Sequence, residues 1–148
     1  MVKDFVKSVK GTDFPKYFDS GITQEAFNKW IEENMVYLTG DTHNEFTRLS
    51  NKYFKKYDLE IRENDYIIVC GDLGLCWSKD KTFEWNCKWF AEKPYTLLWV
   101  QGNHENYDMI DEYPIEKWHG GKVRHIVRDK VILLERGQIF DIDGKTFS

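Results

Sequence analysis

Three places in the chain join a short apolar run to a glycine and then to side chains of the types that bind metal ions. They are Gly40-Asp41-Thr42-His43, Gly71-Asp72 and Gly102-Asn103-His104-Glu105. Carboxylate, amide and imidazole groups are donors for divalent cations, and histidine is also the side chain used most often in acid–base catalysis. If the three places meet in space, they form a candidate metal site with a catalytic histidine beside it.

The runs before these glycines predict the strands that would bring them together. Residues 35–39, 66–70 and 96–101 are short, apolar and bounded by turn residues, which is typical of buried parallel strands. Helices are expected between them at about 45–57 and 80–92, the second ending before Pro94, as in β-α-β crossovers. Because an open α/β sheet binds ligands at the carboxyl ends of its strands, we expect the three junctions to share one site.

The chain after these junctions is expected to add a small β-rich part. A short helical turn is expected at 107–113, and strand candidates follow at 123–127, 131–135 and 138–142. Asp143-Gly144 predicts a hairpin turn with a short return arm, which leaves an open sheet edge.

Residues 1–33 are expected to form a helical extension to a main domain at 34–148. Within the extension, Phe27, Trp30 and Ile31 share one apolar helix face and predict a docking helix.

The expected helix at 80–92 carries apolar residues on two faces. Phe83, Cys87 and Phe90 lie on one side and can cover the sheet. Trp85 and Trp89 lie nearly opposite, so we expect them to need a second cover from the extension, a partner chain or further sequence.

Composition favours one soluble domain. The chain has 148 residues, of which 41% are hydrophobic and 16% aromatic, and this is enough to bury one core. Charged residues interrupt the amino-terminal segment, so neither a signal peptide nor a membrane span is expected. Three cysteines without a CxxC pair favour a reducing, cytoplasmic location. The net charge of −4 argues against nucleic acid as a partner.

The order and spacing of the junctions resemble the calcineurin-like metallophosphoesterase superfamily, most closely its compact bacterial and phage members. His43 and Gly71 are separated by 27 residues, and Asp72 and Gly102 by 29. The resemblance covers about residues 35–148. It implies an α/β fold that is part of a β-sandwich flanked by helices, with a first, mainly parallel sheet present and a second sheet incomplete.

The resemblance also implies a ligand set and a reaction. Asp41 and His43 would hold a first metal ion, and Asp72 would bridge it to a second. Asn103 would bind the second ion, while His104 would face the substrate and stabilise charge or protonate the leaving oxygen. The implied cofactors are two divalent ions, Mn, Fe, Zn or Ni, with Mn favoured. The implied reaction is hydrolysis of phosphate mono- or diesters by a metal-activated water.

Structural roles would also explain several of these residue types. Asp41 and Asp72 follow glycines at strand ends, where aspartates also form turns and helix caps. His119-Gly120-Gly121 favours a turn over a phosphate cradle, and His125 falls inside a strand candidate.

Three further side chains near the junctions have favoured structural interpretations. Cys76 is expected to be a buried free thiol. Trp77 and Tyr107 could stack on a base or an aromatic leaving group, but core packing is the favoured interpretation.

The chain departs from the family pattern first at Leu75 and Cys76. Many members have an acidic residue at the first position, and the phosphoprotein-phosphatase branch has an arginine at the second. The resemblance to protein phosphatases is therefore weak, and the group that orients His104 is left open. Glu105 is a candidate by proximity alone.

A second departure concerns ligands that the family supplies from later sequence. A further histidine and then a Gly-His-x-His element complete both coordination spheres there, and no such element occurs before Ser148. We therefore expect the chain to correspond to an amino-terminal half. The alternative function is a half-domain with weak or no catalysis, which acts as an interaction module or is completed by a second copy or another chain.

Overall fold

Strands and short helices alternate along the described part of the chain, which is residues 6–7 and 35–148 of this computed structural model. The strands are β1 (Val6–Lys7), β2 (Val36–Gly40), β3 (Tyr66–Cys70), β4 (Thr96–Val100), β5 (Ile115–Trp118), β6 (Gly121–Val127), β7 (Val131–Leu134), β8 (Phe140–Ile142) and β9 (Lys145–Phe147). The helices are the 3-10 turn η1 (Thr47–Leu49), α2 (Asn51–Lys56), α3 (Lys81–Ala91) and α4 (Tyr107–Asp111).

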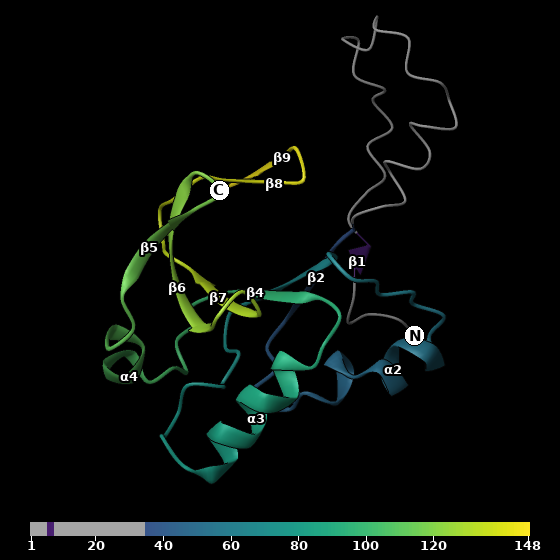
Figure 1. The fold of residues 1–148 in the computed structure, drawn as a ribbon, viewed down its shortest axis with the longest axis horizontal. Helices are drawn as coiled ribbons and strands as arrows, with labels where there is room; N and C mark the ends of the chain where they lie inside the picture. The colour runs from purple at the N-terminus through teal and green to yellow at the C-terminus, as the bar shows by residue number, and fades with distance from the viewer. Residues whose placement is uncertain (1–5, 8–34) are drawn as a thin grey trace, which may run out of the picture.

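A mainly parallel sheet forms the centre of the fold (Figure 1). Its seven strands have the order β1-β2-β3-β4-β7-β6-β5, and β8 and β9 form a separate two-stranded sheet. Strands β2, β3, β4 and β7 are parallel to one another, whereas β1, β6 and β5 pair antiparallel. This confirms the expected α/β class, with a mainly parallel first sheet and a small second one.

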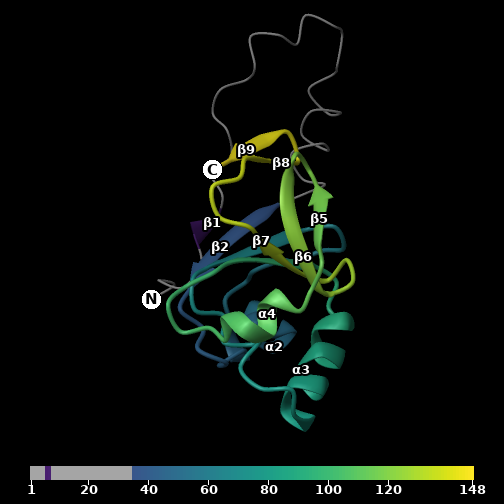
Figure 2. The same cartoon turned by 90° about the vertical axis from the view of Figure 1, so that its left-hand side faces the viewer.

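Alternate residues of the central strands pack into two different cores. Ile67 and Val69 on β3 pack with residues of the helices, whereas Ile68 packs with Phe140 and Ile142 of β8. Figures 1 and 2 show α2, α3 and α4 on one side of the sheet and the β8–β9 hairpin on the other. Because both faces are covered, the central strands are apolar at nearly every position, which is the pattern that identified them.

The predicted helix at 45–57 is interrupted at Ser50. Ser50 has an extended backbone, and its Oγ accepts a hydrogen bond of 3.2 Å from the N–H of Tyr53, so it caps α2. The prediction of one continuous helix was therefore wrong, because the serine ends η1 and begins a new helix. The helix predicted at 80–92 is confirmed as α3, which Asp80 caps.

Strand β5 was not predicted, and it pairs with β6 through a tight turn. His119 and Gly120 occupy that turn, both with positive φ (46° and 91°), which confirms the predicted turn at these residues. Asp143 and Gly144 likewise have positive φ (51° and 69°) in the predicted hairpin between β8 and β9.

The two-faced interpretation of α3 was wrong for Trp89. Its ring stacks on Phe46 and lies edge-on to Phe90, with the ammonium of Lys93 3.5 Å from the ring centroid. The ring therefore joins the core on the sheet side, and Trp85 is the exposed member of the pair.

The predicted extension at 1–33, with its docking helix, lies outside the described residues except for β1. Val6 and Lys7 pair antiparallel with Leu38 and Tyr37 of β2. In the described part of the chain, no helix has the length and apolar character needed to cross a membrane.

Candidate metal centre

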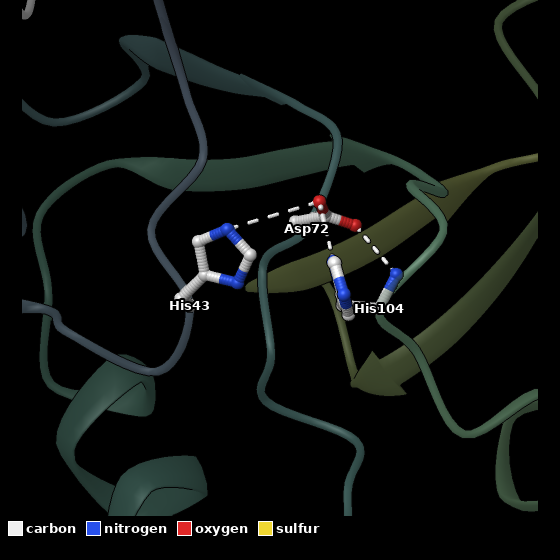
Figure 3. A group of neighbouring side chains, drawn as sticks. All are labelled: His43, Asp72 and His104. Atoms are coloured by element: carbon white, nitrogen blue, oxygen red, sulfur yellow. Dashed lines mark hydrogen bonds and ion pairs between the residues drawn. The ribbon is translucent and has the colours of Figure 1, made fainter.

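The loops that follow β2, β3 and β4 meet at the carboxyl ends of these strands, as predicted. His43, Asp72 and His104 each come from a different loop, and their donor atoms all lie within 4.8 Å of one another (Figure 3). Parallel pairing of the three strands produces this, because it brings Gly40 opposite Cys70 and Cys70 opposite Val100. The three junctions therefore share one site.

Asp72 is the central residue of this cluster. Its Oδ1 accepts a hydrogen bond of 2.8 Å from the N–H of His104, and its Oδ2 lies 3.3 Å from Nδ1 of His104 and 3.8 Å from Nε2 of His43. The hydrogen bond from the His104 N–H is the main cause that lowers the pKa of Asp72. A charged carboxylate with only 8% of its side chain exposed thus faces both imidazoles.

The two histidines form the solvent-facing side of the site. Their side chains are 53% and 61% exposed, and their rings stand edge to face with centroids 5.3 Å apart. His43 and His104 are therefore open to a ligand or substrate while they remain close to Asp72.

The other two predicted ligands lie on the same loops. Oδ1 of Asp41 is 3.7 Å from Nε2 of His43, and the side chain is 76% exposed. Asn103 directly precedes His104 and is also exposed. The structure thus brings Asp41 next to His43 at the edge of the cluster, and the role of the Asn103 amide stays a prediction.

Left-handed backbone conformations concentrate in these loops. Asp41, His43, Asn44 and Asp72 have φ values of 51°, 44°, 64° and 46°. Such a conformation costs about 1–2 kcal/mol at a non-glycine residue and persists where the surroundings enforce it. The left-handed conformation ends the extended backbone of β2 and β3, and the side chains of His43 and Asp72 converge at these loops.

Hydrogen bonds between the loops hold that conformation. The N–H groups of His43 and Asn44 donate to the carbonyls of Asp72 and Leu73 at 2.9 and 3.0 Å. The guanidinium of Arg48 donates to the carbonyls of Gly40 and Asp41 at 3.2 and 3.0 Å. The loop after β2 is thus tied to the loop after β3 on one side and to η1 on the other.

Two glycines permit this close approach. A Cβ at Gly102 would lie 1.9 Å from Oδ1 of Asp72, and a Cβ at Gly74 would lie 2.6 Å from the backbone nitrogen of Asn44. Any side chain at Gly102 would displace the carboxylate around which the site is built.

Glu105 does not orient His104. It is buried, and its Oε1 accepts hydrogen bonds from the N–H of Leu73 at 2.9 Å and from Nε1 of Trp99 at 3.1 Å. Burial raises the pKa of Glu105, and hydrogen bonds such as the one from Leu73 oppose that shift. Proximity in sequence was a poor guide here, and Asp72 is the carboxylate that contacts His104.

A pocket of about 490 Å³ adjoins His43 and His104. Besides these histidines and Trp77, its lining includes residues that sequence reasoning missed, namely Asn44, Ser78, Asp80, Phe83 and Asn86. The sequence contained one signal for this pocket, which is a polar residue, Asn86, at the apolar face of the predicted helix one turn after Phe83. In the structure Asn86 is buried on the inward face of α3.

The cluster fits a divalent ion. Nitrogen and oxygen donors lie about 2.0–2.2 Å from such an ion, so two donors on one ion are separated by at most about 4.4 Å. Nε2 of His43 lies 3.7 Å from Oδ1 of Asp41 and 3.8 Å from Oδ2 of Asp72, and both separations fall within that limit. Two carboxylates with an imidazole are also a donor set suited to the borderline metals predicted from the sequence.

The structural interpretations are confirmed for several other residues. Cys76 is buried, and burial raises the pKa of its thiol to about 12. His125 lies in β6 with 6% of its side chain exposed. Core packing is wrong for Trp77 and Tyr107, because both are exposed.

Comparison with known proteins agrees with the geometry of the site. The family model for calcineurin-like phosphoesterases matches residues 35–146, which include all three loops. No curated protein and no solved structure matches the chain significantly. Since the family match covers most of the chain and the site, the chain belongs to the calcineurin-like phosphoesterase family.

Proposed function

We propose that this protein is a metal-dependent phosphoesterase that hydrolyses phosphate mono- or diesters. The observation that carries the proposal is the convergence of His43 and His104 on the carboxylate of Asp72. Family membership supplies the reaction class. The free cysteines and the absence of a membrane-spanning helix in the described residues support the further proposal of a cytoplasmic location.

We assign the ligands as the family pattern implies. Asp41 and His43 would hold one ion, Asp72 would bridge to a second, and Asn103 would complete the set, with Mn favoured over Fe, Zn or Ni. When bound, such ions supply a more acidic water and draw charge from the phosphoryl oxygens.

His104 is the proposed catalytic residue. The carboxylate of Asp72, 3.3 Å from Nδ1, favours a proton on that nitrogen and holds the ring in place. Nε2 is then the nitrogen left to face a substrate on the exposed side. In the imidazolium form its Nε2–H can donate a hydrogen bond that stabilises charge on the phosphoryl group, or donate a proton to the leaving oxygen.

The experiment is hydrolysis of p-nitrophenyl phosphate and of bis(p-nitrophenyl) phosphate with added Mn²⁺, Fe²⁺, Zn²⁺ or Ni²⁺. The proposal predicts turnover that requires metal and is abolished in Asp72→Asn. Asp58→Asn is a matched control, because Asp58 is exposed and has a similar φ of 53°. Absence of turnover with every metal, or turnover by Asp72→Asn equal to that of the wild type, would overturn the proposal.

A half-domain that acts as an interaction module is the second candidate. The observation that favours it is the exposed indole of Trp85 on α3. Light scattering separates the two: a stable dimer that Trp85→Ser dissociates would support the module, and a monomer with metal-dependent turnover would exclude it.

A further inference from the structure

The pocket beside the two histidines has a volume and a lining that suit the leaving group of a phosphoester. Its volume of about 490 Å³ lies in the range of small-molecule pockets, about 300–1,000 Å³. Its lining combines His43 and His104 with residues of the loop after β3 and of the first turns of α3. A phosphoryl group bound at the histidines would thus have its leaving group beside the pocket.

An aromatic surface is available inside it. The indole of Trp77 is 60% exposed, which is unusual for so large an apolar side chain, and the ring of Phe83 on α3 also lines the pocket. The amide of Asn106 donates a hydrogen bond of 2.8 Å to the carbonyl of Trp77 and so fixes the backbone there. A base or another planar ring stacked on such a side chain gains about 1–3 kcal/mol.

The side-chain amides of Asn44 and Asn86 line the pocket and can hydrogen-bond to a ligand. Nδ2 of Asn86 donates to Oδ1 of Asn44 at 3.3 Å, and Asn86 is buried on the inner face of α3. An amide side chain offers two donors and an acceptor with two lone pairs, so each residue keeps hydrogen-bonding capacity beyond this mutual bond. The pair suits a ligand that carries its own donors and acceptors at the edge of a ring.

The charge of the pocket lining disfavours a leaving group that carries an anionic group of its own, in addition to the phosphoryl group at the histidines. Among the described residues, no lysine or arginine lines the pocket, whereas Asp80 does. Asp80 is held as a carboxylate, because hydrogen bonds from Ser78 and from the N–H of Phe83 lower its pKa. It also caps α3, so the N-terminus of this helix is already satisfied by an anion from the chain itself.

We propose that this pocket binds the leaving group of the phosphoester and selects an uncharged alcohol that carries a planar aromatic ring, as nucleosides and substituted phenols do. This rests on the proposed phosphoesterase function. In the hydrolysis, a P–O bond forms to the oxygen of water, the P–O bond to the oxygen of that alcohol breaks, and the alcohol leaves with a proton from the water. Trp77 is the specificity-determining residue.

The kinetic test compares Trp77→Ala with Trp85→Ala, a matched control with equal exposure outside the pocket. Four substrates are used: p-nitrophenyl phosphate, adenosine 5′-monophosphate, adenosine 5′-diphosphate and glycerol 2-phosphate. Loss of one stacked ring predicts a decrease of about 5- to 150-fold in kcat/KM for the aromatic monophosphates in Trp77→Ala. Glycerol 2-phosphate and the diphosphate should be poor substrates that neither variant affects. Whichever of p-nitrophenyl phosphate and adenosine 5′-monophosphate has the higher kcat/KM shows whether the pocket prefers a phenol or a nucleoside as the leaving group.

A second measurement tests binding in the pocket independently of catalysis. Adenosine and p-nitrophenol are titrated into the metal-free protein, and binding is followed by NMR of the tryptophan indole N–H groups. The inference predicts saturable shifts that Trp77→Ala loses and Trp85→Ala keeps. Metal-dependent turnover with no aromatic preference, or binding that Trp77→Ala leaves intact, would overturn the pocket assignment alone. Absence of turnover of all esters with intact Trp77-dependent binding would instead overturn the proposed function alone.

Discussion

The N–H of His104 donates a 2.8 Å hydrogen bond to one oxygen of Asp72, and Nδ1 of the same histidine lies 3.3 Å from the other oxygen. One carboxylate thus contacts both the backbone and the ring of His104. The loop after β3 is thereby joined to the loop after β4 by the residue that also faces His43. Placement of the carboxylate decides the geometry of the whole site.

Gly102→Ala is expected to disrupt the site without unfolding the protein. The new Cβ would lie 1.9 Å from Oδ1 and 2.3 Å from the backbone nitrogen of Asp72, so both the carboxylate and the loop backbone have to move away from residue 102. We expect the affinity for Mn²⁺ and kcat/KM each to fall at least about tenfold. Equilibrium dialysis and initial rates measure these, with far-UV circular dichroism as the check on folding.

Gly137→Ala is the control for that variant. Gly137 has φ +68° and no atom within 4 Å of an added Cβ, so the substitution adds backbone strain of about 1–2 kcal/mol and no collision. Its Mn²⁺ affinity should equal that of the wild type. Wild-type affinity in Gly102→Ala as well would show that the close approach of Gly102 does not position Asp72.

Substitution of His43 and of His104 is expected to have different effects, because His43 binds the metal ion and His104 acts in catalysis. His43→Ala should raise the dissociation constant for Mn²⁺ at least about tenfold. His104→Ala should lower kcat by about 10²- to 10⁴-fold with little change in that constant. Metal titrations and steady-state kinetics on both variants decide the matter. Equal losses of metal affinity would make His104 a ligand.

Glu105 is expected to stabilise the loops rather than take part in the reaction. Glu105→Ala leaves the N–H of Leu73 and Nε1 of Trp99 buried without their acceptor, which predicts a loss of about 2–4 kcal/mol in the free energy of unfolding. Glu105→Gln keeps an acceptor oxygen for both donors, so it should lose less of the free energy of unfolding than Glu105→Ala does. Urea unfolding measures both, and equal stability of the two variants would contradict the assignment.

Asp65 predicts a specific dependence of stability on pH. Its carboxylate is buried before β3 and accepts hydrogen bonds of 2.7 Å from the N–H groups of Met35 and Arg62. Burial raises its pKa above the ordinary 3.8, while these bonds oppose the shift. The folded state therefore binds this proton more tightly than the unfolded state does. The resulting stability is fully present below pH 3.8 and is lost as the pH rises through the folded pKa.

Asp65→Asn removes this titration. The free energy of unfolding of the wild type minus that of the variant should therefore decrease as the pH rises above 3.8 and through the raised folded pKa. Urea titrations at several pH values measure the difference. A difference that is constant or that increases with pH would contradict the raised pKa.

The strands and their junctions could be predicted because their signal is local. Residues 66–70 and 96–101 are apolar at nearly every position, and parallel pairing alone brings their carboxyl ends together. Asp72 could be recognised as a central residue from the order of the motifs. Strand β5 had no such signal, because Ile115–Trp118 is a partly exposed edge strand.

Contacts between side chains could not be predicted in the same way. Glu105 is adjacent to His104 in sequence, yet it binds Leu73 and Trp99, because neighbouring residues in the loop project in different directions. Trp89 was placed opposite the core on the basis of helical spacing, but a large ring at the border of a helix face can turn to pack on Phe46. The left-handed conformation of Asp72 is one that aspartate adopts more readily than most residues, but the neighbouring loops decide which aspartates adopt it.

Binding of Mn²⁺ to the wild type, Asp72→Asn and Asp58→Asn, followed by the electron paramagnetic resonance signal of the free ion, tests the central claim most directly. The site built around Asp72 predicts saturable binding by the wild type and Asp58→Asn, and a dissociation constant at least about tenfold higher for Asp72→Asn. Equal binding by all three proteins, or no binding by the wild type, would contradict it.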